Sequence, residues 1–246
     1  MSDTLLVIPC YNEAKRLQTD AFVGALATDD GLSLLFVDDG STDSTPQMLD
    51  ELAMREPAVS VLRMSRNAGK AEAVRAGLRR ALESDHAFVG YWDADLSTPL
   101  AAAFGFRQLL KEHADVDWVL GSRVRLLGRR IDRRASRHYP GRAFSTAASL
   151  VLGLPVYDTQ CGAKLFRVTA DLPGLLEDAF SSGWAFDVEL IARLVSTVGR
   201  ERAAQRIVEH PLEEWRDVPG SNVGFLAALS AFAALARIRV RYSPGH

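Results

Sequence analysis

The thirteen residues "AFVGYWDADLSTP" (87–99) join an apolar run to two acids that follow it directly. The run is mostly apolar as far as Trp92; Asp93 and Asp95 come next, and Ser-Thr-Pro then signals a turn. A short, continuous apolar run is typical of a strand in a parallel sheet that is covered on both faces. Acids at the end of such a strand lie at the sheet edge where α/β proteins bind their ligands.

Three more segments have the same form and end in polar residues: "TLLVIPCYNE" (4–13), "LSLLFVDDGSTD" (32–43) and "AVSVLRMS" (58–65). Helical patterns separate these strands. Thr45 and Pro46 mark the start of a helix over 46–56, and apolar residues recur at helical spacing over 70–85. The sequence therefore predicts an α/β fold with a mostly parallel, doubly wound sheet, helices on both faces, and three polar strand ends that share one crevice.

The composition is that of an ordinary globular protein, with 246 residues, 48% hydrophobic and 24% charged. A net charge of −2 excludes a uniformly basic nucleic-acid binder, and we expect no nucleic-acid partner. Cys10 and Cys161 are too few for a disulfide framework or a cysteine metal cage, which favours a reduced, cytoplasmic compartment. Asp3 and the short apolar run after it argue against a signal peptide, and no segment has the roughly 18–20 apolar residues that span a bilayer.

The second half of the chain begins with an arginine-rich segment. Residues 121–142 hold eight arginines and one aspartate, a local charge of +7 (8 − 1), so the remainder carries −9 (−2 − 7). Near the end, Phe225, Leu229 and Phe232 share one face of a predicted amphipathic helix, and three arginines follow. That helix either packs into the core or lies in a membrane interface.

The pair Asp93 and Asp95 points to a divalent metal. Residues i and i+2 of a strand face the same way, and two neighbouring carboxylates repel each other unless a cation lies beside them. Mg²⁺ and Mn²⁺ prefer oxygen ligands and share their shell with substrate phosphates. An isolated Asp-x-Asp is more often a solvated loop, but the position after a buried strand, beside two other acidic strand ends, favours the metal site.

The other strand ends suit a nucleotide. A carboxylate at Asp38 would accept a hydrogen bond from a ribose hydroxyl or a base, whereas Asp39 suits a turn or a helix cap as well. Lys70 opens a predicted helix after Asn-Ala-Gly, where backbone N–H groups and an ammonium favour a base or phosphate. Neither a Walker loop nor G-x-G-x-x-G is present, so P-loop hydrolysis and hydride transfer lack their fingerprints.

Five motifs follow one another along the chain: "IPCYNE", "VDDGSTD", "NAGKAEAVRAG", "DADLSTP" and "GSR". Taken in this order, they resemble glycosyltransferase family 2, whose members have the GT-A nucleotide-sugar fold. Further on, "DTQCGAKLF" (158–166) and "WAFDVEL" (184–190) resemble the polyprenyl-phosphate branch, especially the dolichyl-phosphate glucosyltransferases. The resemblance implies transfer of a hexose from a nucleotide diphosphate with inversion at the anomeric carbon, assisted by Mg²⁺ or Mn²⁺.

The resemblance also assigns residues. Those expected at the nucleotide sugar are Pro9, Tyr11, Glu13, Asp38, Lys70, Asp93 and Gln160. Those expected at the reacting sugar and the metal–diphosphate are Asp95, Asp158 and Asp187, with Asp93 and Asp95 as the metal ligands and Arg123 at a phosphate. One position departs from the mannosyltransferase relatives, which usually have a further metal ligand, glutamine, where this chain has Ser97.

The role of Asp187 depends on the acceptor. A sugar hydroxyl needs a general base, which Asp187 would supply, whereas a lipid monophosphate is already mostly anionic at neutral pH, leaving Asp187 to orient sugar hydroxyls. Arginine forks bind phosphate, and basic clusters attract anionic membranes. The arginine-rich segment therefore favours a phosphate acceptor at a membrane surface. The arginines expected to serve it are Arg129, Arg130, Arg133 and Arg134, beside Arg123.

We therefore expect a hexosyltransferase that moves glucose from UDP-glucose to a polyprenyl phosphate, either cytoplasmic or peripheral on the cytoplasmic face of the membrane. We expect a catalytic domain over 1–220, divided near residue 120 into nucleotide and acceptor halves, and a basic amphipathic tail over 221–246. The alternatives are a hydroxyl acceptor, GDP-mannose as donor, a non-catalytic nucleotide-sugar or membrane-binding module and, more distantly, a nucleotidyltransferase.

Overall fold

The computed structural model describes residues 2–132, 135–217 and 225–242, with the backbone alone for 135–140 and 225–229. Its strands are β1 (Thr4–Cys10), β2 (Leu32–Asp38), β3 (Val59–Arg63), β4 (Phe88–Trp92), β5 (Trp118–Ser122), β6 (Arg130–Asp132), β7 (Ala163–Arg167), β8 (Ile207–Pro211) and β9 (Glu214–Arg216). Its helices are α1 (Thr19–Thr28), α2 (Thr45–Arg55), α3 (Lys70–Ala81), α4 (Ala102–Glu112), α5 (Ala135–Leu152), α6 (Leu172–Leu175), α7 (Phe186–Val198), α8 (Arg200–Arg206) and α9 (Phe225–Tyr242).

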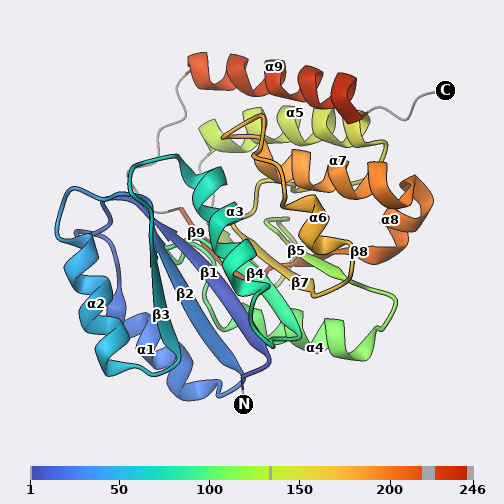
Figure 1. The fold of residues 1–246 in the computed structure, drawn as a ribbon. Helices are drawn as coiled ribbons and strands as arrows, with labels where there is room; N and C mark the ends of the chain where they lie inside the picture. The colour runs from blue at the N-terminus through green and yellow to red at the C-terminus, as the bar shows by residue number, and fades with distance from the viewer. Residues whose placement is uncertain (1, 133–134, 218–224, 243–246) are drawn as a thin grey trace.

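The central sheet has seven strands in the order β3-β2-β1-β4-β7-β5-β8 (Figure 1). The four pairings that do not involve β7 are parallel, and β7 runs antiparallel between β4 and β5. The predicted mostly parallel sheet is confirmed. Because β7 is antiparallel, its first residues lie beside the carboxyl end of β4, where Asp93 and Asp95 follow.

Helices cover both faces of the sheet, as predicted. The apolar residues of α1, α2 and α4 pack with alternate residues of β1 and β2, such as Ile8 and Phe36, in one core cluster. The helices α3, α5, α7 and α9 share the other cluster with Val7 and Val37. Close approach of α3 requires Gly77, where a Cβ atom would lie 2.3 Å from a methyl group of Val7. These two layers fix the strand ends that carry the site.

The predicted amphipathic helix near the C-terminus is present as α9, which lies outermost, over α5 and α7 (Figure 1). Its inward face is formed by Ala231, Ala234, Leu235 and Ile238, all at most 2% exposed. Phe232, expected on the apolar face, is 43% exposed, and the side chains of Phe225 and Leu229 lie outside the described residues. One face of α9 therefore belongs to the core, while the other remains accessible.

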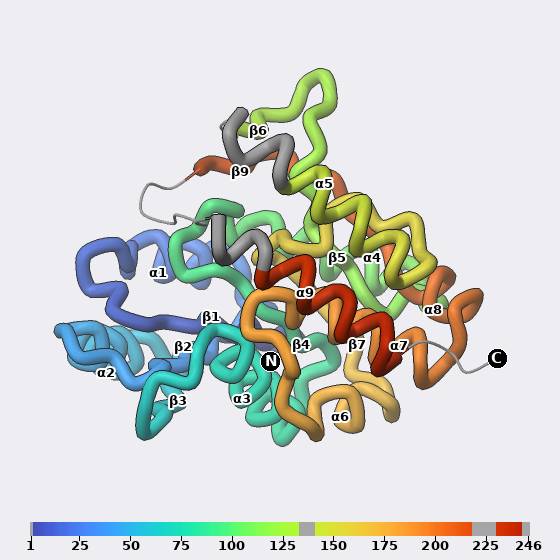
Figure 2. The backbone as a smooth tube through the Cα atoms, turned by 90° about the horizontal axis from the view of Figure 1, so that it is seen from above, coloured from blue at the N-terminus to red at the C-terminus, as the bar shows by residue number. Residues whose placement is uncertain are grey.

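A second, two-stranded sheet pairs β6 with β9 in parallel. The segment between β5 and β6 projects beyond the rest of the chain (Figure 2). Within this segment, Leu126 and Leu127 are exposed, Leu127 completely. Among the described residues, the structure contains no helix with the length and apolar character needed to cross a membrane.

Candidate active site

Three strand ends enclose a pocket of about 210 Å³, as the sequence predicted. Its walls come from the loop after β1, the residue after β2, the start of α3 and the loop after β4. The lining residues are Pro9, Cys10, Tyr11, Glu13, Arg16, Asp39, Lys70, Ala73, Asp93, Ala94 and Asp95. Of the seven residues predicted at the nucleotide sugar, five line this pocket, while Asp38 and Gln160 lie outside its lining.

Side-chain hydrogen bonds hold the loop after β1 against the loop after β2. Asn12 adopts a left-handed conformation (φ 53°), and its amide oxygen accepts a hydrogen bond from the Thr42 backbone N–H at 2.8 Å. The backbone N–H of Glu13 donates to the Thr45 hydroxyl, also at 2.8 Å. Asparagine tolerates a left-handed conformation better than other side chains, so this position suits it. Tyr11 and Glu13 are thereby held at the pocket.

The two acids that end β2 have different roles in the structure. The Asp38 carboxylate accepts a hydrogen bond from the Ser41 backbone N–H at 3.0 Å and is 4% exposed. The Asp39 carboxylate accepts from the backbone N–H groups of Ala68 and Gly69 at 2.7 and 2.8 Å, so it fixes the loop that leads into Lys70. Asp39, which the sequence favoured less, is the acid that lines the pocket.

Asp93 lies between a lysine and a glycine. The Lys70 ammonium is 2.5 Å from an oxygen of Asp93. Burial alone would lower the pKa of Lys70, but the carboxylates of Asp93, Asp187 and Asp95 outweigh it and raise that pKa. On the other side, a Cβ atom at Gly162 would lie 1.9 Å from Asp93 Oδ2, so only glycine leaves room for this carboxylate. The Lys70 ammonium in this pocket is therefore under the influence of three acids, of which Asp93 and Asp95 line the pocket.

Asp95 follows in a turn. One of its carboxylate oxygens accepts a hydrogen bond from the Ser97 backbone N–H at 2.9 Å, and Ser97 itself is 8% exposed. Within the described part of the chain, no three side chains of His, Cys, Asp or Glu form a metal-binding group. Asp93 and Asp95 nevertheless supply hard oxygen donors at the pocket. They fit Mg²⁺ or Mn²⁺ if the diphosphate and water complete the shell.

Asp187, in the first turn of α7, is buried and held by two residues from neighbouring strands. Lys164 of β7 donates to Asp187 Oδ1 at 2.6 Å, and the Tyr91 hydroxyl of β4 donates to the same oxygen. Burial, with the negative charge of Asp187, raises the pKa of Tyr91 well above its ordinary value. Lys164 is 1% exposed and also donates to the Cys161 carbonyl oxygen at 2.6 Å.

Arg123 and Asp158 form a bidentate ion pair. The guanidinium nitrogens Nε and Nη2 of Arg123 lie 2.7 Å from the two oxygens of Asp158. Glu209, whose pKa burial raises, accepts from the backbone N–H groups of Tyr157 and Asp158 at 2.7 Å each. The Gln160 backbone N–H donates to Asp158 at 3.2 Å, and Gln160 Nε2 is buried without a hydrogen-bond partner. The structure thus joins three predicted residues in one cluster.

The arginine-rich segment is partly neutralised by acids far along the chain. Arg129 Nη1 lies 2.7 Å from Glu213, and Arg130 Nη2 lies 3.5 Å from Glu214. Arg133 and Arg134 lie outside the described residues. The local charge of +7 counted from the sequence therefore overstates the charge of this surface, because β9 brings Glu213 and Glu214 beside β6.

Sequence reasoning did not single out Lys164 or Tyr91. Lys164 occurs within "AKLF", where a lysine between apolar residues suggests an exposed position on an edge strand. In the structure it is almost fully buried and directly opposite Tyr91 across the β4–β7 pairing. Its only signal in the sequence was its place in the "DTQCGAKLF" motif.

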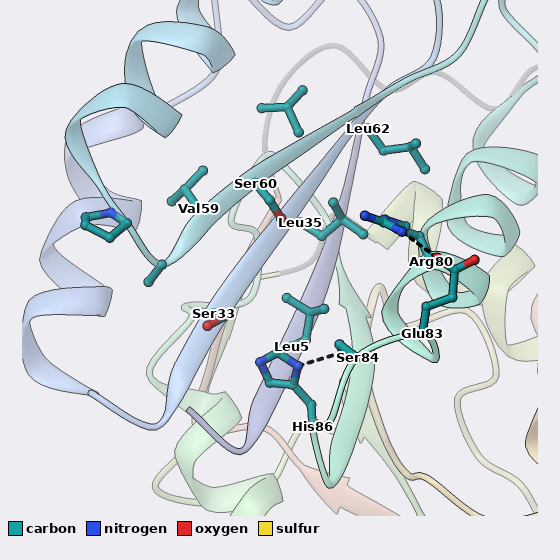
Figure 3. Close-up of a pocket in the computed structure, with 13 residues that line it drawn as sticks. Leu5, Ser33, Leu35, Val59, Ser60, Leu62, Arg80, Glu83, Ser84 and His86 are labelled. Atoms are coloured by element: carbon teal, nitrogen blue, oxygen red, sulfur yellow. Dashed lines mark hydrogen bonds and ion pairs between the residues drawn. The ribbon is translucent and has the colours of Figure 1, made fainter. Parts of the chain in front are cut away.

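A larger hollow, about 310 Å³, lies away from these carboxylates, beside the amino-terminal halves of β1 and β2 and the edge strand β3 (Figure 3). Leu5, Leu35 and Leu62 face it, and a hydrogen bond of 2.7 Å joins Ser84 to His86 at its rim. None of the predicted site residues lines it.

Comparison with known proteins identifies the family. A model of glycosyl transferase family 2 matches residues 5–172. A dolichyl-phosphate beta-glucosyltransferase of Trichomonas vaginalis is 27% identical over 254 residues, which cover 98% of this chain and 72% of that protein. An undecaprenyl-phosphate mannosyltransferase of Micrococcus luteus is 30% identical, over 85% of this chain and 82% of that protein.

Solved structures agree on the fold. Glucosyl-3-phosphoglycerate synthase from Mycobacterium tuberculosis, solved with Mn²⁺, UDP-glucose and phosphoglyceric acid, superposes with a TM-score of 0.65 at 18% sequence identity, over 97% of this chain and 80% of that chain. The predicted GT-A fold is thereby confirmed. With the family model matching more than half of its residues, this chain belongs to glycosyl transferase family 2.

Proposed function

We propose that this protein transfers a hexose, with glucose and UDP-glucose as the preferred sugar and donor, to a polyprenyl phosphate with inversion at the anomeric carbon. The support is twofold. The pocket at the strand ends combines acids and a lysine suited to a nucleotide diphosphate with a metal. Two relatives that cover most of the chain are named for transfer to dolichyl and undecaprenyl phosphate.

In this proposal, Asp95 and Asp93 hold Mg²⁺ or Mn²⁺. When bound, the ion neutralises the negative charge that grows on the departing diphosphate. Tyr11, Glu13 and Asp39 line the nucleotide's space, and Lys70 adds a positive charge beside Asp93. Solved structures of two proteins with a similar fold contain Mn²⁺ together with a nucleotide sugar, which is compatible with this arrangement.

The observation that carries the phosphate acceptor is the environment of Asp187. One of its oxygens already accepts hydrogen bonds from Lys164 and Tyr91. Both partners hold this carboxylate in one place, and Asp187 does not line the pocket, so it is poorly placed to take a proton from an incoming acceptor. A lipid monophosphate has its second pKa near ~6 and arrives with an anionic oxygen, so it needs no base. Asp187 then serves best as a residue that orients sugar hydroxyls.

The acceptor side is proposed to lie around Arg123, Asp158 and the arginine-rich segment. Arg123 pairs with Asp158, and a phosphate would compete for the same guanidinium fork. Leu126 and Leu127 project from this segment and Arg125 accompanies them, which suits contact with a lipid surface. We propose that the protein works peripherally on the cytoplasmic face of an anionic membrane.

We propose that successive segments of the chain have different functions. Residues 1–120 would bind the nucleotide, residues 121–220 the acceptor, and the tail over 221–246 would add a basic, partly exposed helix. The exposed side of α9 presents Phe232, Val240, Arg237, Arg239 and Arg241. Apolar and basic side chains on one accessible face suit an anionic interface.

The experiment is a donor screen against two matched acceptors, a polyprenyl phosphate and the corresponding free alcohol, with the product identified by mass. The proposal expects a hexosyl phosphate lipid and a released nucleoside diphosphate, with UDP-glucose preferred. A product formed only on the alcohol would contradict the phosphate acceptor. A preference for GDP-mannose would change the donor, and release of pyrophosphate would indicate a nucleotidyltransferase.

A further inference from the structure

Lys164 and Tyr91 form a buried polar pair for which the proposed reaction has no role yet. They are direct partners in the antiparallel pairing of β4 with β7, so their side chains emerge on the same face of the sheet. The ammonium of Lys164 lies 5.1 Å from the centroid of the Tyr91 ring. Both donate hydrogen bonds to Asp187 Oδ1, which belongs to α7, a helix packed against this face of the sheet.

The same face of the sheet continues into the pocket. Asp93 stands two residues after Tyr91, and Gly162 stands two residues before Lys164, so the next cross-strand position places Asp93 beside Gly162. The Asp93 backbone N–H donates to the Gly162 carbonyl oxygen at 2.9 Å. The Asp187 charge reaches the pocket as well, because it contributes to the raised pKa of Lys70. Asp187 is therefore a buried neighbour of the predicted donor site.

Burial makes this arrangement costly unless it is complete. An ionised side chain removed from water loses its solvation, which only paired charges and hydrogen bonds recover. Lys164 is 1% exposed and Asp187 is 6% exposed. With the ammonium and the phenol on one oxygen, the carboxylate has a single orientation. Lys164 also donates a hydrogen bond to the Cys161 carbonyl oxygen in the 158–162 loop, so this one side chain positions both Asp187 and that loop.

We propose that Lys164 and Tyr91 are positioning residues that aim the second oxygen of Asp187 at the sugar of the bound donor. This inference rests on the proposed nucleotide-sugar donor and adds two residues that determine how the sugar is held. It predicts that loss of either contact weakens recognition of the sugar while recognition of the nucleotide remains.

The chain offers a matched control on the same helix. Glu189, two residues after Asp187, is 0% exposed and accepts hydrogen bonds from Arg193 at 2.9 Å and from the Tyr242 hydroxyl at 3.0 Å. Tyr242→Phe thus removes a tyrosine hydroxyl from a buried carboxylate of α7, as Tyr91→Phe does. Neither tyrosine lines the pocket, and Tyr242 donates to Glu189 instead of Asp187.

The test measures the affinities of Tyr91→Phe, Tyr242→Phe and the unaltered protein for UDP and for UDP-glucose by calorimetry with Mn²⁺ present, together with melting temperatures. We expect Tyr91→Phe to bind UDP-glucose roughly ten-fold more weakly, the cost of about one hydrogen bond to a charged group, and UDP within about two-fold of the unaltered protein. Tyr242→Phe should bind both ligands normally. Equal losses for both ligands, no loss, or the same loss in Tyr242→Phe would overturn the inference.

A second comparison covers Lys164, whose single replacement leaves a buried carboxylate unpaired. Lys164→Met is measured alone and in an Asp187→Asn background, where both charges are absent. If Lys164 acts through Asp187, the double variant should bind UDP-glucose within about two-fold of Asp187→Asn alone. An additional ten-fold loss in the double variant would contradict that route. An unaltered protein that binds neither UDP nor UDP-glucose would instead refute the proposed donor, and this inference with it.

Discussion

Gly162 shows how a single backbone position shapes the site. The Asp93 carboxylate occupies the space in which a side chain at 162 would lie, 1.9 Å from the Cβ position. A carboxylate is the free end of a side chain and can rotate away, whereas a backbone group cannot. The two kinds of close approach should therefore have different consequences when glycine is replaced.

We predict that Gly162→Ala displaces Asp93 and lowers kcat/KM at least ten-fold while the protein stays folded. Gly90→Ala is the comparison, since its Cβ would meet the Lys164 backbone carbonyl oxygen at 2.1 Å. That variant should lose several degrees of melting temperature, because strands β4 and β7 would have to separate. Steady-state kinetics and thermal denaturation of both variants distinguish the two effects. Normal activity of Gly162→Ala would show that the position of Asp93 is unimportant.

The helix α7 presents two buried acids, and the second ties it to its neighbours. Glu189 accepts hydrogen bonds from the Ser181 backbone and hydroxyl, from Arg193 and from Tyr242 at the end of α9. Burial alone would raise the pKa of Glu189, but these partners outweigh it and lower that pKa below its ordinary value of 4.5. Arg193 also donates to the carbonyls of Leu175, Asp178 and Ala179.

A lowered pKa has a definite consequence for stability. Because the folded protein binds the Glu189 proton less readily than the unfolded chain, the stabilisation is complete above about pH 4.5 and is lost as pH falls through the lowered folded-state pKa. Glu189→Gln should therefore reduce the free energy of unfolding at pH 7 and flatten its decline below pH 4.5. Urea denaturation from pH 3 to 7 measures both. A variant with the same acid slope as the unaltered protein would exclude Glu189 as a source of that slope.

The strands and their order at the site could be predicted in part from sequence. The strands that end at Cys10, Asp38 and Trp92 are legible, because each is a continuous apolar run followed by acids or amides. The antiparallel direction of β7 could not be predicted, because an apolar strand has the same sequence pattern in either direction. The pairing of Tyr91 with Lys164 depends on that direction and on register. Long-range ion pairs such as that of Arg129 with Glu213 could not be predicted either, because they too depend on how the strands pair.

At the scale of the whole molecule, the residues proposed to contact the membrane lie on elements of the second half. Leu127 is fully exposed on the segment between β5 and β6, and Val240 is 84% exposed on α9. In the first half of the chain, Met54 of α2 is similarly exposed, at 85%, and provides a comparison. A protein whose acceptor is embedded in a membrane needs a surface of this kind near the acceptor side.

We predict that replacing Leu126 and Leu127 with serine reduces sedimentation with vesicles that contain an anionic phospholipid and raises KM for a polyprenyl phosphate. Replacing Arg129, Arg130, Arg133 and Arg134 should have the same two effects. The effects should be smaller than for the loss of four free positive charges, because Glu213 and Glu214 already pair with two of these arginines. Met54→Ser should leave both quantities unchanged. Equal vesicle binding by all three variants and the unaltered protein would refute this surface as the membrane contact.

Asp93 and Asp95 are proposed to hold a divalent cation together with the diphosphate of the nucleotide. The most direct measurement is the amount of Mn²⁺ bound per chain, followed by electron paramagnetic resonance with and without UDP, in the unaltered protein and in Asp95→Asn. Uncomplexed UDP with Mn²⁺ gives the background. We predict about one additional Mn²⁺ bound per chain when UDP is added, and its loss in Asp95→Asn. Equal Mn²⁺ binding by both proteins in the presence of UDP would contradict it.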